Sequence, residues 1–183
     1  FSGRMSFMET ISVLPAEKTA ELGSDRTIIF YSSRPELQYR RPDDFLDTSW
    51  GVICFPEHFI GLPATETGQV RVTNVASYPL WKGLGPEPYT REKQRWTRAA
   101  TAASEEIIGN YQSSIVYQDS FTPVTIERFT RKAHGAIYGS SHKLKDGRTP
   151  WPNLFIAGTD QGYLGIVGAM LSGITIVNQH ILR

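Results

Sequence analysis

Hydrophobic and polar residues alternate in several short stretches of the 183-residue chain. A period of two places successive side chains on opposite faces of a strand, so these runs predict half-buried strands. The alternation is cleanest at residues 69–76, and residues 5–14 alternate more loosely until Pro15 ends the run. Three further short runs rich in β-branched and aromatic residues lie at 27–31, 50–55 and 114–118. We expect runs 50–55 and 69–76, joined by a turn region, to be antiparallel neighbours.

One long amphipathic pattern follows the run at residues 69–76. Apolar residues recur at helical spacing at Trp96, Ala100, Ala103 and Ile107. Thr90 is a suitable N-cap and Gly109 a suitable stop, which predicts a helix over 91–109. Residues 36–49 are expected to form a loop or short helix, and residues 78–89 a loop with Leu80 and Trp81 turned inward. The order of elements predicts an α+β fold with a mostly antiparallel sheet and a helix packed on one face.

The stretch from Asn153 to Val177 follows a different pattern. The apolar run Leu154–Ala157 has the length of a buried strand, and Gly158-Thr159-Asp160 ends it. A helix is predicted next, because the apolar residues Ile166, Met170, Ile174 and Val177 form a continuous stripe. The small residues beside that stripe indicate a helix that is buried.

A strand, a glycine loop and the unpaired N–H groups of a helix start together form a seat for an anionic or electron-rich ligand. Small residues would let a flat ligand lie near the first helical turn, and Asp160 would accept hydrogen bonds from ligand hydroxyls. The alternative interpretation is an ordinary strand-to-helix connection in which small residues serve tight packing.

Composition narrows the classes of site. The 19 basic and 18 acidic residues give a net charge of +1, so no strong attraction to nucleic acid is expected. The lone Cys54 excludes an internal disulfide and any multi-cysteine metal site. The four histidines lie far apart in the sequence, and no metal site is expected. No apolar run reaches the ~20 residues that a membrane-spanning helix needs.

A second dense patch runs from Thr122 to Gly139. In one interpretation, Gly135 and Gly139 permit close backbone approach, while Phe129 and Tyr138 wall an apolar cavity. In the other, a helix begins near Thr122-Pro123 and presents a solvated charged face through Arg128, Arg131 and Lys132.

Together, TPxTxERFT followed by GAxYG in residues 122–139, and NLFIAGTDQGxLGIVGAMLSGI in residues 153–174, resemble the C-terminal part of the phytoene desaturase family. That family includes carotenoid desaturases, carotenoid isomerases and retinol saturase-type reductases, which are FAD-dependent relatives of the amine oxidases. The match is dense over residues 119–178, and the preceding strands and helix fit the family's substrate domain in order and type. The resemblance implies a substrate-binding sheet domain in residues 1–150 and the C-terminal strand-loop-helix of an FAD-binding domain in residues 151–183.

The resemblance also implies roles for individual residues. Gly158 and Thr159 would place backbone against the FAD pyrophosphate and ribityl region, where Asp160 would accept hydrogen bonds. The helix start facing the flavin's pyrimidine edge would be formed by Gly165, Ile166, Val167 and Gly168. Substrate would contact Phe129, Gly135 and Tyr138. The flavin would perform hydride transfer at N5. No acid or base is assigned, because the polar groups nearest the motif, Arg128, His134 and Tyr138, are of types that more often have structural roles at such positions.

The implied protein is an FAD-dependent oxidoreductase that acts on a carotenoid-like or isoprenoid lipid as a desaturase, saturase or isomerase. A cytoplasmic location is expected, and a lipid substrate would favour peripheral contact with a membrane. Such enzymes begin with a Rossmann GxGxxG motif, which this chain lacks. The chain also opens at Phe1 without an initiator methionine, so we expect a fragment that is inactive alone and binds FAD weakly or not at all.

Two alternatives stay open on sequence grounds. A flavin amine oxidase would use the same scaffold with a polar substrate and a cage of paired aromatic residues facing the flavin. A non-catalytic lipid-binding or interaction domain would keep the fold without the cofactor.

Overall fold

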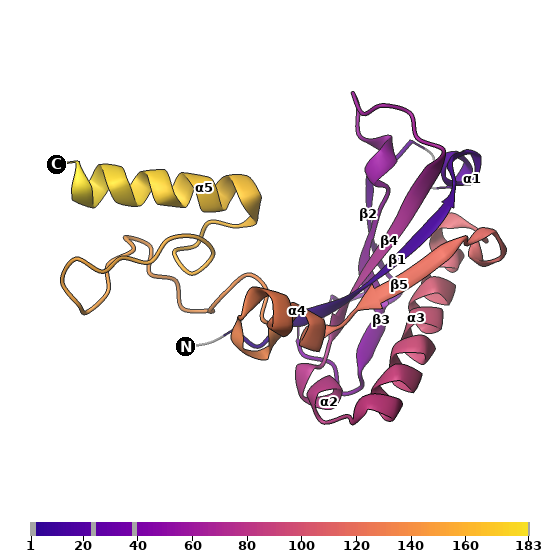
Figure 1. The fold of residues 1–183 in the computed structure, drawn as a ribbon, viewed down its shortest axis with the longest axis horizontal. Coiled ribbons are helices and arrows are strands. Elements are labelled where there is room, and N and C mark those ends of the chain that lie inside the picture. The colour runs from indigo at the N-terminus through magenta and orange to yellow at the C-terminus, as the bar shows by residue number, and fades with distance from the viewer. Residues whose placement is uncertain (1–2, 23–24, 38–39, 183) are drawn as a thin grey trace.

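The computed structural model describes residues 3–22, 25–37 and 40–182, which form two lobes (Figure 1). The sheet lobe, residues 3–138, holds the strands and most of the helices. The C-terminal lobe, residues 140–182, consists of a long loop and the helix α5, Gly165–Ile176. The architecture is α+β, as the sequence pattern predicts.

The described strands form one antiparallel sheet of five strands in the order β2-β3-β4-β1-β5. Their bounds are β1 Ser6–Pro15, β2 Ile28–Ser32, β3 Leu46–Cys54, β4 Thr67–Ala76 and β5 Tyr117–Phe121. β1 pairs with β4 along its whole length, from Ser6 opposite Ala76 to Pro15 opposite Thr67. β3 pairs with the other edge of β4, which confirms the predicted antiparallel neighbours.

Two strand boundaries differ from the sequence prediction. β3 begins at Leu46 rather than Trp50, because polar residues join the ladder through a register shift between Asp47 and Val52. β5 begins at Tyr117 rather than Ser114, because the residues before it form the 3₁₀ turn η2, Gln112–Ser114.

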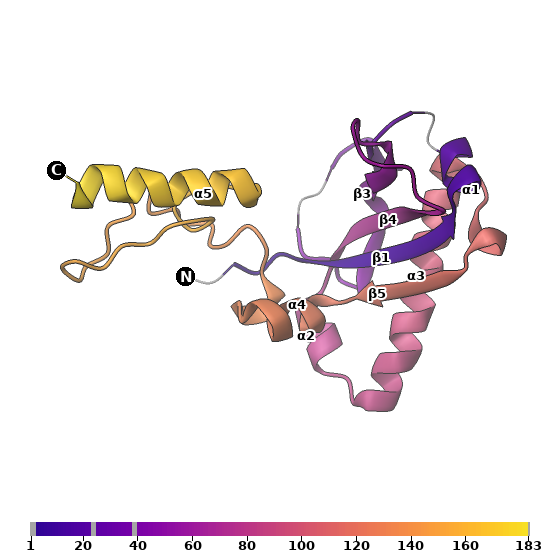
Figure 2. The same ribbon diagram turned by 45° about the horizontal axis from the view of Figure 1, so that its top comes forward.

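The helices pack around the sheet unevenly. Their bounds are α1 Ala16–Glu21, α2 Tyr78–Lys82, α3 Pro86–Ile108 and α4 Pro123–Thr130, with the 3₁₀ turns η1 Pro56–His58 and η3 Ala133–Gly135 and the π-helical turn η4 Val177–Ile181. α3 lies along one face of the sheet (Figures 1 and 2). The core lies between α3 and that face and includes Met8, Leu14, Ile53, Phe55, Val70, Val72, Trp81 and Tyr111.

The long helix starts earlier than its sequence pattern predicts. Gly85 is the N-cap and Pro86 occupies the first turn, where a residue without an N–H group costs no hydrogen bond. Thr90 is therefore not the cap; it lies inside α3 and its hydroxyl donates to the Pro86 carbonyl at 3.0 Å. The predicted end is confirmed, because Gly109 caps the helix with a φ of 92°.

The buried face of α3 is more polar than predicted. Trp96 and Ala100 are buried as expected, but Ala103 is half-buried and Ile107 is exposed. Hydroxyl groups replace them against the sheet: Thr97 pairs with Ser120 at 2.7 Å, and Thr101 accepts from Gln118 at 3.0 Å. A polar helix face can pack against a sheet when each buried group finds a partner, as these do.

Residues 78–89 are not the predicted loop. Ser77 and Pro79 start the short helix α2, which ends at Lys82. Trp81 is buried as expected, whereas Leu80 is exposed.

The C-terminal lobe contains two further corrections. Leu154–Ala157 is not a buried strand: within the described residues, Phe155 forms an isolated bridge with Arg148, and Leu154 is exposed. The predicted helix is present as α5, but its apolar stripe is exposed rather than buried, at Ile166, Met170, Ile174 and Val177. Across the described ranges, no helix has the length and apolar character to cross a bilayer.

Candidate functional site

The glycine turn, Gly158–Gly162, follows the Phe155 bridge and precedes α5. Two backbone hydrogen bonds close it, from Gln161 N–H to Gly158 O at 3.1 Å and from Gly162 N–H to Thr159 O at 3.2 Å. Gly158 has a φ of +88°, and a Cβ built there would meet no atom within 4 Å. Backbone in the positive φ region with open space beside it allows close approach by another molecule.

Two polar residues that the sequence analysis did not single out hold this turn in place. Gln161 is 1 % exposed and donates from Nε2 to the Lys145 carbonyl at 3.0 Å. Its Oε1 accepts from the hydroxyl of Ser172, a buried residue of α5. The Ser172 oxygen in turn accepts from Gly158 N–H at 2.5 Å. The turn is therefore fixed to both the helix and the preceding loop.

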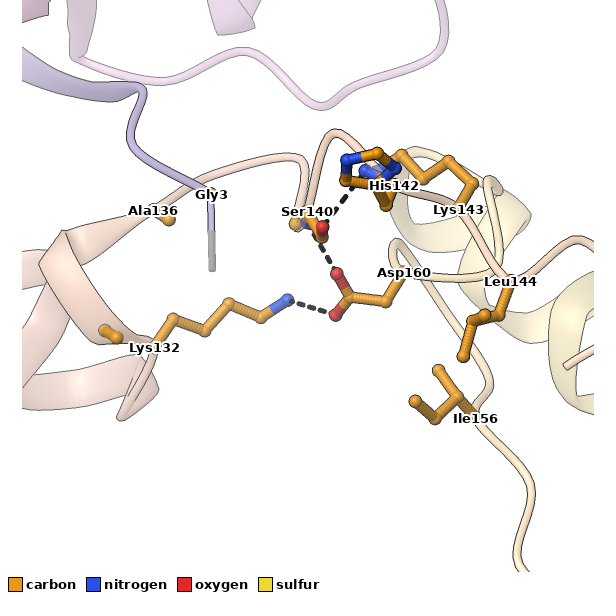
Figure 3. A pocket seen from close by; sticks show the side chains of 11 residues that line it. Gly3, Lys132, Ala136, Ser140, His142, Lys143, Leu144, Ile156 and Asp160 are labelled. Atoms are coloured by element: carbon orange, nitrogen blue, oxygen red, sulfur yellow. Dashed lines mark hydrogen bonds and ion pairs between the residues drawn. The ribbon is translucent and has the colours of Figure 1, made fainter. Parts of the chain in front are cut away.

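Asp160 lies at the edge of a cleft of about 710 Å³ between the two lobes (Figure 3). Its Oδ1 accepts from the Ser140 N–H at 2.6 Å, and its Oδ2 is 3.7 Å from the Lys132 ammonium. The polar residues of the cleft are Lys132, Ser140, His142, Lys143 and Asp160, and its apolar residues are Ala133, Ala136, Leu144 and Ile156. We call it the Asp160 cleft.

The lysines of this cleft bind the glycine turn directly. Lys132 Nζ donates to the Thr159 hydroxyl at 2.9 Å, so Lys132 does not belong to a purely solvated face as one interpretation predicted. Lys143 Nζ donates to the carbonyls of Tyr138 at 2.5 Å and Thr159 at 2.8 Å. The two contacts with Thr159 are not visible in the local sequence, because Lys132 and Lys143 lie 27 and 16 residues away from it in the chain.

The start of α5 is open. Gly165 has a φ of +73°, and a Cβ there would also meet nothing within 4 Å. No side chain caps this helix terminus in the described structure, and Ile166 and Val167 are 84 % and 69 % exposed. Gly168 instead packs on Tyr163, whose backbone carbon would lie 3.2 Å from an added Cβ. The cofactor residues implied by the resemblance thus form an exposed, uncapped helix start.

The predicted substrate residues do not share one cavity. Phe129 is 75 % exposed on α4. Tyr138 contacts Phe7 edge-on at 6.1 Å between ring centroids and lines a smaller hollow of about 430 Å³. Gly135 is buried, and its backbone packs closely against the start of α4 rather than against a cavity. A Cβ added there would lie 2.2 Å from the Pro123 carbonyl oxygen.

The helix interpretation of residues 122–130 is confirmed by α4. Thr122 and Thr125 form a capping box at its start, and Pro123 occupies the first turn. The Glu127 carboxylate is hydrogen-bonded to two side chains of α2: it accepts from the Tyr78 hydroxyl at 2.7 Å and from Lys82 Nζ at 2.8 Å. The network joins α2 to α4, next to the segment that lines the Asp160 cleft.

These contacts shift the ionisation of all three groups. The hydrogen bonds from Lys82 and then Tyr78 lower the pKa of Glu127, and the bond to Glu127 raises the pKa of Lys82. Burial, followed by the hydrogen bond to Glu127, raises the pKa of Tyr78, so its phenol stays protonated at neutral pH. The cluster therefore joins α2 to α4 through hydrogen bonds to an ionised carboxylate.

The lowered pKa of Glu127 predicts a loss of stability in acid. A carboxyl whose folded pKa is below its ordinary value of 4.5 contributes stability above that pH and loses it as the pH falls through the folded value. We expect the free energy of unfolding of Glu127→Gln to lie below that of the wild type at neutral pH and to converge with it in acid. Urea titrations at a series of pH values measure this, with the exposed Glu106→Gln on α3 as control. A constant offset at every pH would contradict the assignment.

Among the described residues, no group of three or more histidine, cysteine, aspartate or glutamate side chains is arranged to hold a metal ion. Comparison of the chain with protein-family models, with curated proteins and with solved structures found no match.

Proposed function

We propose that this chain supplies the flavin-facing and substrate-binding part of an FAD-dependent oxidoreductase that acts on a carotenoid-like or isoprenoid lipid. The observation that carries the proposal is the segment Gly158–Gly168. Two of its three positive-φ glycines, Gly158 and Gly165, have free space beside them, and the helix start is uncapped. These features accompany the sequence resemblance to the phytoene desaturase family at the same residues.

The residues of this segment fit the chemistry of the cofactor. The open backbone at Gly158 and Thr159 would lie against the pyrophosphate and ribityl region. The Asp160 side chain is 39 % exposed, so its carboxylate keeps acceptor capacity for ribityl hydroxyls beside its bonds to Ser140 and Lys132. The start of α5 carries roughly half a positive charge, which favours the electron-rich pyrimidine edge of a flavin. When bound, FAD would supply hydride transfer at N5.

The sheet supports the substrate side of the proposal. Strand pairing places Phe7, Ile11 and Val13 of β1 on the face opposite α3, because the alternate residues of β1 face that helix. On the same face, Tyr117 lies opposite Val13, Phe121 lies opposite Glu9, and Val52 lies opposite Thr73, the partner of Glu9. The face also carries charged groups: Glu9 pairs with Arg71, and Asp119 lies opposite Ile11. The apolar groups of this face would form one wall of a tunnel for a polyene.

The proposal predicts that the complete gene product containing this chain carries a GxGxxG segment upstream and binds FAD. We expect the 183-residue chain alone to bind FAD weakly, in the range above micromolar, or not at all. Flavin fluorescence titration of both proteins tests this. Micromolar or tighter binding by the chain alone would contradict the divided site.

The reaction is tested by incubating the complete flavoprotein with FAD and a long acyclic polyene of the carotenoid class. Desaturation lengthens the conjugated system and shifts its absorbance to the red, and saturation shifts it to the blue. If the protein oxidised a polar amine and did not react with the polyene, the amine oxidase alternative would be supported. Polyene binding by a complete protein without flavin would indicate the non-catalytic lipid-binding alternative.

A further inference from the structure

Lys132 belongs to the sheet lobe but binds the C-terminal lobe. It directly follows Arg131, the left-handed residue that ends α4 with a φ of 60°, and that turn points the chain away from the helix axis. Its ammonium donates to the Thr159 hydroxyl at 2.9 Å and is 3.7 Å from Asp160 Oδ2. Figure 3 shows the side chain extending across the cleft from the α4 side toward Asp160.

Thr159 and Asp160, the partners of Lys132, are also held by contacts with Gly139 and Ser140. A Cβ added at Gly139 would lie 2.4 Å from Asp160 Oδ1 and 3.0 Å from the Thr159 hydroxyl oxygen, so the turn packs directly on that glycine. Ser140 N–H donates to the same Oδ1 at 2.6 Å, whereas Lys132 faces Oδ2. With Lys132 bound, both Asp160 oxygens and the Thr159 hydroxyl have a defined orientation.

The charge of Lys132 matters as much as its position. Asp160 lies in the turn that the proposed function places beside a pyrophosphate, and an uncompensated carboxylate there would repel the anionic ligand. Lys132 compensates that charge from the sheet lobe, which is the lobe proposed to hold the substrate.

We propose that Lys132 is a positioning residue for the cofactor turn: it fixes Thr159 and Asp160 and neutralises the Asp160 carboxylate, thereby coupling the substrate sheet to the flavin-binding turn. The role rests on the proposed function. Lys132 acts through Asp160 rather than by binding the cofactor itself, so the effects of changing the two residues must be non-additive.

The first test needs no cofactor. Amide hydrogen exchange is measured on the chain for peptides covering 158–162 in the wild type, Lys132→Met, Lys132→Arg and the control Lys145→Met. Lys145 is exposed and holds Gln161 through its backbone carbonyl, which methionine keeps, so its replacement makes the same change in charge without removing that bond. We expect Lys132→Met to accelerate exchange about tenfold, as the loss of a charge-assisted hydrogen bond implies, and Lys132→Arg to restore most of the protection. Equal exchange in Lys132→Met and Lys145→Met would overturn the proposal.

The second test uses the complete flavoprotein and a double-mutant cycle on FAD affinity. We expect Lys132→Met to weaken FAD binding about tenfold in the wild-type background and much less in the Asp160→Asn background. Equal losses in the two backgrounds would mean that Lys132 contacts the cofactor independently, and would overturn the proposed route through Asp160. If the wild-type protein binds no FAD while exchange responds as expected, the proposed function fails and the coupling of the turn to the sheet lobe stands.

Discussion

Replacing Gly135 with alanine is expected to lower the free energy of unfolding by about 3 kcal/mol or more, from left-handed strain and overpacking together. Gly135 has a φ of +55°, which L side chains rarely adopt. An added Cβ would also lie 2.2 Å from the Pro123 carbonyl oxygen and 3.2 Å from Pro123 Cα. Both obstacles are backbone atoms at the start of α4, so no side-chain rotation relieves the overlap.

Gly61→Ala is the matched control for this change. Gly61 also has a positive φ, of +86°, but a Cβ there would meet nothing within 4 Å. It should therefore lose only about 1 to 2 kcal/mol, the cost of the left-handed conformation. Urea denaturation followed by circular dichroism gives both values. If the two variants lost equal stability, the close approach of Gly135 to Pro123 would not be the cause.

The effect of Gly135→Ala should extend to the Asp160 cleft. The Gly135 carbonyl accepts from the buried Ser6 hydroxyl at 2.6 Å, which ties η3 to the first residue of β1. Lys132, Ala133 and Ala136 on either side of it line the cleft. A shift of this glycine would therefore move the residues that hold the glycine turn.

The strands were the most predictable part of the fold. Residues 69–76 alternate cleanly because β4 lies in the middle of the sheet with one face fully buried, at Val70, Val72 and Ala76. Boundaries set by polar residues were not predictable. The start of β3 depends on a register shift beside Asp47, which no local pattern contains.

The buried face of α3 could not be read from apolar spacing for a related reason. Thr97 and Thr101 are buried because hydroxyl and amide groups on β5 complete their hydrogen bonds. A polar residue becomes a core residue only when a distant partner satisfies it, and the sequence alone does not identify that partner.

At the candidate site, too, features set by the local sequence were predictable and features set by distant partners were not. The glycines at 158 and 165 were recognisable because open positive-φ backbone requires that residue type. Lys132 and Ser172 were not, because their roles come from contacts with Thr159 and Gln161 across 27 and 11 residues of chain. The exposed stripe of α5 was predicted as buried because a helix that is apolar on most sides is usually covered.

Trp81→Ala is expected to lower the free energy of unfolding by about 3 to 5 kcal/mol, the range for removing a large aromatic side chain from a core. Trp81 is 1 % exposed, and its Nε1 donates to the Phe45 carbonyl at 3.1 Å. Its ring lies edge-on to those of Phe45 and Tyr89, at centroid distances of 5.2 and 5.6 Å. Alanine would leave a cavity between α2, α3 and the sheet and would remove one of the two hydrogen bonds to the Phe45 carbonyl, which also accepts from the Ser77 N–H at 3.0 Å.

Trp151→Ala removes the same side chain from the C-terminal lobe, where Trp151 is 66 % exposed, and should change stability by less than about 0.5 kcal/mol. Comparable losses in the two variants would contradict the placement of Trp81 in the core. Trp81→Ala should also weaken the acid dependence assigned to Glu127, because α2 carries both Tyr78 and Lys82. If that dependence survived unchanged while stability fell, α2 would hold its contacts to α4 without the tryptophan, and the junction beside the Asp160 cleft would be independent of the core.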